Sequence, residues 1–174
     1  MERADSNLSK STIDLHNFVF HEDADNFYVQ LKEHGAIMHL PGASDFAECD
    51  AFREWLWRQL RGYYHDLWLI RDIPNSSVIG FVLAYGYRIY DAHCYITAVV
   101  WDADITVFEQ ALCEAVSNLH REYPLHKVFM EVAGDDSDII IAAEKVGFIK
   151  ELCRRKSRFV NGIFQDVYTL GRSF

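Results

Sequence analysis

The sequence predicts one α/β domain with a central mixed sheet, mostly antiparallel, of about seven strands flanked by about four helices. The 174 residues fit one domain, because domains usually hold about 100–200 residues. Half of the residues are hydrophobic, enough to form a sizeable core. Apolar residues alternate between strand and helix spacing in the order β-α-α-β-β-β-α-β-α-β-β, which favours a sheet covered by helices. We expect this domain to span residues 13–174, after a disordered polar tail over residues 1–12.

The domain is expected to begin with a strand followed by two helices. Residues 13–20 have the composition of a strand, and residues 22–34 place apolar side chains on one helical stripe that ends at a glycine. The second helix is predicted over residues 45–63, where apolar residues recur every four positions. Asp45 and Glu48 are spaced as a capping pair at its start.

The rest of the chain is predicted to supply six strands and two helices. The expected strands are residues 67–73, 78–88, 92–101, 127–133, 148–158 and 164–170, and the expected helices are residues 104–121 and 137–146. In the first of these helices a buried stripe is predicted from Phe108, Leu112, Val116 and Leu119. Asn161 and Gly162 are expected to form a turn between the last two strands.

The charge balance restricts the partners of the protein. With 17 Lys and Arg against 26 Asp and Glu, the net charge is −9. Nucleic acid is therefore not expected as a main partner, because phosphate binding needs a basic face. An anionic membrane surface is not expected for the same reason. The apolar stretch over residues 78–87 is too short to span a bilayer, which takes about 20 residues.

The first residues and the cysteines suggest a compartment. Residues 1–11 are polar and lack the apolar core of a secretory signal, so we expect a cytoplasmic protein. The four cysteines are scattered without the spacing of a zinc site, and no metal is expected. We expect reduced and mostly buried thiols, with disulfides as the alternative.

Three short segments resemble the GNAT acyltransferase superfamily. They are Ala143–Phe148 (AEKVGF), Gly162–Tyr168 (GIFQDVY) and Ile79–Phe81 (IGF), and they occur in the matching elements in the matching order. The resemblance covers residues 13–170 and is nearest to the branch of ribosomal-protein N-acetyltransferases. It implies an acetyl-CoA or other acyl-CoA donor, or a carrier thioester, and an amine acceptor that is a small molecule or a protein N-terminus.

The family's phosphate-binding loop is altered in this chain. In the family, a glycine-rich turn at a helix start holds the coenzyme A pyrophosphate with backbone N–H groups. Here Asp104 and Thr106 occupy the positions of the two glycines, and Trp101 occupies the opening position. The carboxylates of Asp102 and Asp104 oppose a phosphate, because like charges about 4 Å apart cost roughly 1–4 kcal/mol. Asp104 is instead predicted to be an N-cap, with Val107 as the third helical residue.

The resemblance still implies a cofactor site around this helix start. The residues that it places at the acyl donor are Val99, Val100, Asp104, Ile105, Thr106, Val107, Phe108 and Lys145. For Val99 and Val100 the contacts would be made by the backbone, because the pantetheine arm adds to the strand like another strand. Lys145 has an ordinary solvated helix position as its alternative interpretation. Asp136 replaces a family asparagine, and Ala143 replaces a tyrosine that acts as general acid in some members.

His93 is the candidate base, because the resemblance places it at the position of a glutamate in the family's fourth strand. A histidine with a pKa of about 6.5 accepts a proton at neutral pH. Tyr95 shares its face of an alternating strand and is the second candidate, whereas Cys94 points to the other face and is expected in the core. An ordinary histidine at a strand start remains the alternative.

Two functions stay open from the sequence. One is acyl transfer from a thioester to an amine, with His93 as base. The other is a GNAT-fold binding or scaffold protein that no longer uses acetyl-CoA. An aromatic group on the second helix and the next strand is either core or the wall of an acceptor groove, and it comprises Phe52, Trp55, Trp57, Tyr63, Tyr64 and Trp68. The acceptor and the oligomeric state are not indicated.

Overall fold

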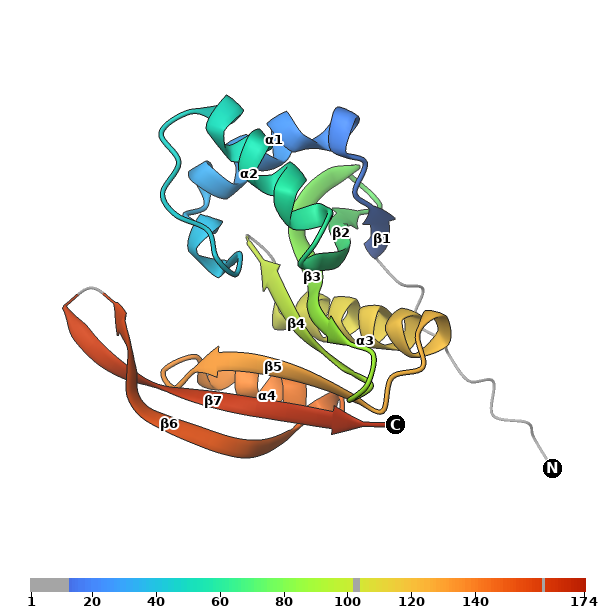
Figure 1. Ribbon diagram of the computed structural model, residues 1–174, viewed down its shortest axis with the longest axis vertical. Helices are drawn as coiled ribbons and strands as arrows, with labels where there is room; N and C mark the ends of the chain where they lie inside the picture. Colours follow the sequence, from blue (N-terminus) through green and yellow to red (C-terminus); the bar gives the residue numbers. More distant parts are fainter. Residues whose placement is uncertain (1–12, 102–103, 161) are drawn as a thin grey trace.

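The computed structural model describes residues 13–101, 104–160 and 162–174. The predicted tail over residues 1–12, the carboxylate of Asp102 and the turn residue Asn161 lie outside them. The elements are β1 (Ile13–Asn17), α1 (Phe20–Glu33), the 3-10 helix η1 (Ile37–His39), α2 (Cys49–Leu60), β2 (Tyr64–Asp72), β3 (Ser77–Arg88), β4 (His93–Val100), α3 (Ile105–Glu122), β5 (Lys127–Ala133), α4 (Ser137–Lys145), β6 (Ile149–Val160) and β7 (Ile163–Ser173) (Figure 1).

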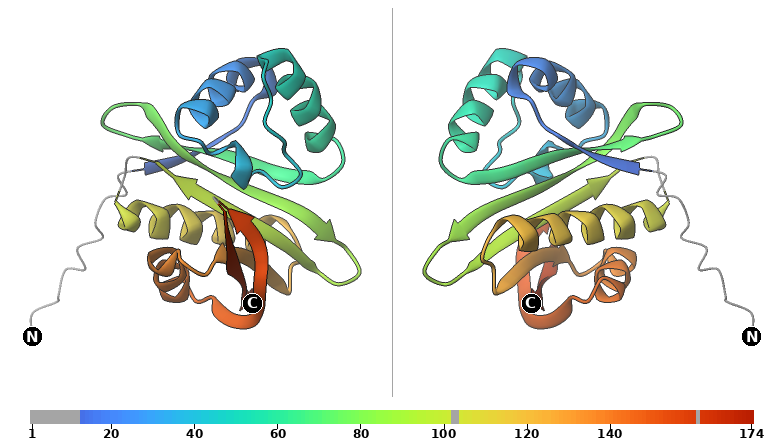
Figure 2. Two further views of the ribbon diagram at one scale, coloured as in Figure 1. Left: turned by 90° about the vertical axis from the view of Figure 1, so that its left-hand side faces the viewer. Right: turned by 90° about the vertical axis from the view of Figure 1, so that its right-hand side faces the viewer.

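The strands form one seven-stranded sheet in the order β1-β2-β3-β4-β5-β7-β6. All neighbouring pairs are antiparallel except β4 and β5, so the predicted mixed, mostly antiparallel sheet is confirmed. Helices α1 and α2 cover one face of the sheet, and α3 and α4 cover the other (Figure 2). The structure thus has three layers with a hydrophobic cluster on each side of the sheet.

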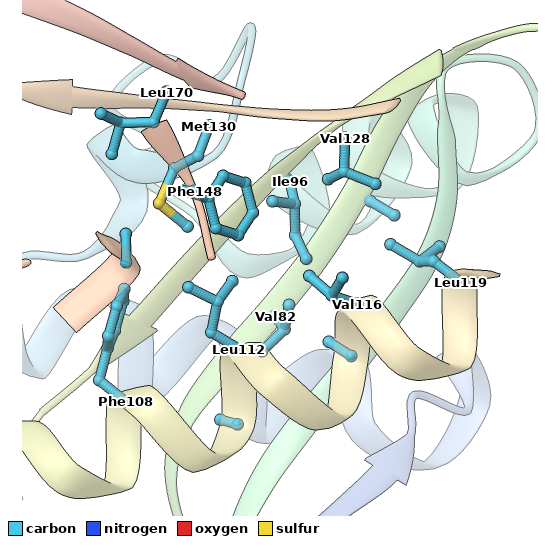
Figure 3. Close-up of a cluster of buried hydrophobic side chains, with 14 of the residues drawn as sticks. Val82, Ile96, Phe108, Leu112, Val116, Leu119, Val128, Met130, Phe148 and Leu170 are labelled. Atoms are coloured by element: carbon cyan, nitrogen blue, oxygen red, sulfur yellow. The ribbon is translucent and has the colours of Figure 1, made fainter. Parts of the chain in front are cut away.

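The larger cluster lies between the sheet and α3. The predicted stripe of Phe108, Leu112, Val116 and Leu119 is buried and faces the strands (Figure 3). Ile96 of β4 and Val128 of β5 meet it from the sheet. This packing fixes the start of α3 against the two central strands, which is where the candidate site forms.

The pairing between β4 and β5 is short. Three residues of β4, from His93 to Tyr95, pair with Lys127 to Phe129, and beyond them the two strands diverge (Figure 1). Strand β3 remains paired with β4 as far as Gly80 opposite Val100. A Cβ atom at Gly80 would lie 2.3 Å from the carbonyl oxygen of Val99, so this close approach requires glycine. The far half of β4 is therefore held from one side only.

Some local expectations were wrong. Helix α2 begins at Cys49, and no side chain caps it. Asp45 instead forms an ion pair with Lys32, with 2.8 Å between Nζ and Oδ1. The first strand ends at Asn17, because α1 already begins at Phe20.

The cysteines are less buried than expected. All four are free, but only Cys94 is buried, whereas Cys113 and Cys153 are exposed and Cys49 is half-buried. Cys113 is exposed because it lies on the solvent side of α3, and Cys153 is exposed because its position on β6 faces solvent. Within the described residues, no helix is long and apolar enough to cross a membrane.

Candidate active site

A cavity of about 380 Å³ opens where β4 and β5 part. Its walls are the second halves of the two strands, from Thr97 to Val100 and from Met130 to Ala133. Phe108 and Ile105 of α3 close it on one side of the sheet. His39 of η1 and Arg158 of β6 also line it. The cavity passes between the strands, since the residues in its walls belong to both faces of the sheet.

The edge of β4 that faces the cavity is suited to an extended ligand. Beyond Tyr95 this edge has no ladder partner on β5. Backbone N–H and C=O groups need partners, so an extended chain in the gap would be bound like an additional strand. Val99 and Val100, the two predicted backbone contacts, both line the gap.

The start of α3 is capped from within the chain. Asp104 is the N-cap residue, and its Oδ1 accepts a hydrogen bond from the Thr106 N–H at 3.2 Å. The predicted cap is thus confirmed, although the Asp104 side chain accepts from the backbone N–H of the second helical residue, Thr106. The Val107 N–H donates to the Asp104 carbonyl oxygen at 2.9 Å. Asp104, Ile105 and Phe108 line the cavity, whereas Thr106 and Val107 do not.

Carboxylates surround this mouth of the cavity, which we call the α3 mouth. Asp104 of α3 lies there with Asp136 and Asp138 at the start of α4. Burial raises the pKa of the Asp136 carboxyl and the neighbouring Asp135 raises it further, whereas His39 and Arg158 oppose the shift. Within the described residues, no group of three or more His, Cys, Asp or Glu side chains is arranged to hold a metal ion.

His93 and Tyr95 lie outside the cavity lining. They share one face of β4 as predicted, and each ring lies 5.5 Å from the ring of Phe129. His93, however, is in the paired part of β4, four residues before Thr97, which corresponds to about 13 Å along a strand. The geometry therefore does not support His93 as the base. Cys94 is buried on the opposite face as expected, and burial raises its pKa to about 12.

Lys145 contacts another helix rather than the cavity. Its Nζ atom forms an ion pair with Glu109 Oε1 at 2.5 Å, so it connects α4 to α3. The side chain is otherwise exposed. This arrangement agrees with the alternative interpretation of a solvated lysine on a helix surface.

Glu131 is the functional candidate that the sequence analysis missed. It follows Phe129 on the same face of β5, next to the point where the β4 ladder ends, and lines the cavity. Its Oε1 lies 2.7 Å from Arg154 Nη2. The signal for it was present in the sequence, because an acidic residue interrupts the apolar strand over residues 127–133.

His39 and Arg158 form a second mouth of the cavity, which we call the β6 mouth. Partial desolvation lowers the pKa of His39, the nearby Arg158 guanidinium lowers it further, and Asp136 opposes both effects. Neither residue had a signal in the sequence. One comes from the short η1 turn and the other from an irregular part of β6, and only the folded chain brings them together.

Comparisons with known proteins show the fold. No protein-family model matches the sequence, and no curated protein matches it. Among solved structures, a chimera of the Vibrio cholerae spermidine N-acetyltransferase SpeG and hSSAT is 18% identical, covers 94% of this chain and 96% of its own, and has a TM-score of 0.79. SpeG in complex with CoA and spermine is 18% identical, with coverages of 93% and 95% and a TM-score of 0.74.

A second acetyltransferase gives the same result. The ribosomal L7/L12 alpha-N-protein acetyltransferase RimL, in complex with coenzyme A, is 15% identical, with coverages of 94% and 95% and a TM-score of 0.79. These matches extend over nearly the whole described domain. The chain therefore has the fold of the GNAT acetyltransferases.

Proposed function

We propose that this protein transfers an acetyl or other acyl group from a thioester to an amine. The observation that carries the proposal is the cavity between β4 and β5, which has an unpaired strand edge along one wall and a carboxylate at its inner end. An acyl-pantetheine arm fits the first feature, because its amides can pair with the β4 backbone beside Val99. The structural neighbours RimL and SpeG, both solved with coenzyme A, support a thioester of this kind.

Glu131 is the base that this geometry favours. An amine must lose a proton before its lone pair can attack a thioester carbonyl. The Glu131 carboxylate takes that proton, the C–N bond forms, and the C–S bond breaks with sulfur leaving as a thiolate. The proton then passes from Glu131 to solvent or to the thiolate. The carboxylates of the cavity also favour a cationic amine as the acceptor.

The α3 mouth distinguishes between possible donors. Asp104 has taken one free N–H group of the helix start, and its charge opposes a pyrophosphate. A thioester held mainly through its arm, such as one on a carrier protein, depends less on this mouth than acetyl-CoA does. The same observation favours the second candidate function, a binding or scaffold protein without catalysis.

Ligand binding is tested by a thermal-shift titration with acetyl-CoA and with S-acetyl-pantetheine. A ligand at 100 times its dissociation constant stabilises the folded state by about 2.7 kcal/mol. We expect both ligands to raise the melting temperature. If neither does at millimolar concentration, the acyl-transfer proposal fails and the scaffold function is favoured.

The base is tested by steady-state acetyl transfer to a panel of amines. Glu131→Gln is expected to lower kcat by about 10²-fold or more, because general bases contribute about 10²–10⁴-fold. Glu122→Gln is the matched control, since Glu122 is exposed near the end of α3 and does not line the cavity. If His93→Ala lowers kcat more than Glu131→Gln does, the base assignment to Glu131 is wrong.

A further inference from the structure

Strand β6 contains an irregularity near the cavity. Arg154 lies opposite Val167 of β7, and Arg158 lies opposite Gln165. Four steps along β6 thus correspond to two steps along β7, so β6 bulges by two residues between these pairs. Lys156 lies in the bulge with φ of +47°, a conformation that non-glycine residues rarely adopt. Without the bulge, Lys156 rather than Arg158 would lie opposite Gln165.

Asp166 of β7 holds the bulge in place. Its Oδ1 accepts a hydrogen bond from the Lys156 N–H at 2.8 Å. Its carbonyl oxygen accepts another from the Gly134 N–H, also at 2.8 Å. A Cβ atom on Gly134 would lie 3.3 Å from Asp166 Cβ, so the loop after β5 packs tightly against the same residue. Asp166 therefore connects the bulge to the end of the strand that carries Glu131.

Arg158 consequently reaches the cavity with its donors available. It lines the main cavity and an adjoining one of about 240 Å³, together with Glu131 in both. Arg154 is ion-paired with Glu131, but in the part of the chain that the structure describes no carboxylate lies within 4.0 Å of the Arg158 guanidinium. Arg158 is half-buried, and its planar group offers five N–H donors in a fork that matches a carboxylate.

Arg158 lies on the acceptor side of the proposed reaction. The adjoining cavity is lined by Glu131, Arg154 and Val167, which share the sheet face of Thr97 and Val99. This is the face covered by α1 and α2, opposite to the face covered by α3 and α4 (Figure 2). In the proposed reaction the donor arm lies along the open edge of β4 toward the start of α3, so the space beside Glu131 on the face of α1 and α2 is left for the acceptor.

We propose that Arg158 binds a carboxylate of the acceptor, so that the protein acylates amines which carry a carboxylate group. The inference rests on the proposed acyl transfer. Such an acceptor places its amine at Glu131 and its carboxylate at Arg158, and both ends meet a group of opposite charge in one cavity. Asp136 interacts electrostatically with Arg158 in this cavity, but among the described residues no carboxylate comes within 4.0 Å of the guanidinium, so its N–H donors are available to a carboxylate ligand.

The selectivity is tested with β-alanine and propylamine, which have the same chain length but differ in the carboxylate. In acetyl transfer by the wild-type protein, kcat/KM is expected to favour β-alanine at least about tenfold, the usual scale for a charge-assisted hydrogen bond. Arg158→Gln is expected to reduce that ratio to about one. Arg155→Gln is the matched control, because Arg155 is exposed in the same bulge and does not line the cavity. Equal use of both amines by the wild type, or the same ratio in Arg158→Gln, would overturn the inference.

A second measurement separates this inference from the proposed function. The ¹⁵N-edited spectrum of the arginine Nε–H groups reports carboxylate binding without turnover, and the Arg158 signal is assigned from its loss in Arg158→Lys. Titration with β-alanine should shift this signal, whereas propylamine should not. A shift without acetyl transfer to either amine keeps the carboxylate site and rejects the proposed function. Transfer without a shift keeps the function and rejects the role of Arg158.

Discussion

The two mouths of the cavity are built in different ways. The α3 mouth is formed by helix starts anchored in the core, with Phe108 fully buried behind Asp104. The β6 mouth is formed by the short turn that carries His39 and by the part of β6 directly after the bulge, which carries Arg158. The charges differ as well, because carboxylates dominate at α3 and a guanidinium lies at β6.

Because of this difference, we expect substitutions at the α3 mouth to affect stability and substitutions at the β6 mouth to affect ligand recognition. Substitutions behind the α3 mouth disturb packed core, where a lost side chain costs both transfer free energy and a cavity. Substitutions at the β6 mouth affect half-exposed groups, whose removal usually changes stability little. Residues at the β6 mouth can therefore be substituted with little effect on the packed scaffold behind the α3 mouth.

The largest expected effect is on stability at the α3 mouth. Phe108→Ala removes a ring that is 1% exposed and packed between α3 and the sheet (Figure 3). We expect the free energy of unfolding to fall by about 3–5 kcal/mol, as for other buried phenylalanines. Urea denaturation followed by circular dichroism measures the loss.

Two controls complete this experiment. Val107→Ala, at the half-buried position before Phe108, should cost clearly less. Arg158→Ala at the β6 mouth should stay within about 0.5 kcal/mol of the wild type. If Arg158→Ala destabilised the protein as much as Phe108→Ala, the two mouths would not differ in the way described.

The next effect concerns the cap at Asp104. Asp104→Ala removes the acceptor for the Thr106 N–H and is expected to cost about 0.5–2 kcal/mol of stability. Asp104→Ser keeps a capping oxygen and should cost only a fraction of that. Both variants remove a carboxylate from the α3 mouth, so both should bind acetyl-CoA more tightly, by about 1 kcal/mol or roughly fivefold.

The pair of variants separates capping from charge. Calorimetric titration gives the affinity, and thermal unfolding gives the stability. Tighter binding in Asp104→Ser with nearly unchanged stability would show that the carboxylate, and not a distorted helix start, limits donor binding. Unchanged affinity in both variants would contradict a repulsive role for Asp104.

Sequence patterns predicted the scaffold because they are local. The order of strands and helices, the buried stripe of α3 and the cap at Asp104 all depend on residues within a few positions of one another. The start of α2 was missed because Asp45, which resembles a capping residue, pairs with Lys32 across space. The aromatic group was divided by tertiary packing, since Phe52 is fully buried whereas Trp57 is 41% exposed.

The site was harder to predict because it depends on where a ladder ends. His93 and Glu131 both lie on the correct face of the sheet, but only the end of the β4–β5 pairing after Tyr95 decides which of them meets the cavity. No pattern within β4 marks that point. Arg158 depends on a two-residue bulge held by Asp166. Asp166 lies in the recognised segment Gly162–Tyr168, but nothing in the sequence shows that its side chain holds a bulge in β6.

The smallest expected effect is a shift in the titration of His39, which reports the charges at the β6 mouth. Desolvation lowers the pKa of His39 first, then Arg158 lowers it, and Asp136 raises it. Arg158→Gln should therefore raise the pKa of His39, and Asp136→Asn should lower it below that of the wild type. Histidine ring resonances followed by NMR against pH, assigned with His39→Gln, give the values.

The same shift predicts a change in acid sensitivity. A histidine whose pKa is lower in the folded state takes up a proton on unfolding. The free energy of unfolding therefore falls as the pH drops from the ordinary histidine pKa through the lowered pKa of the folded state. Arg158→Gln should reduce that loss, because one cause of the lowered pKa is gone. Arg155→Gln, with the same charge change outside the cavity, should leave the His39 titration as in the wild type. If both arginine variants shifted the pKa of His39 equally, a general charge effect would explain the titration, and Arg158 would not be the cation that His39 faces.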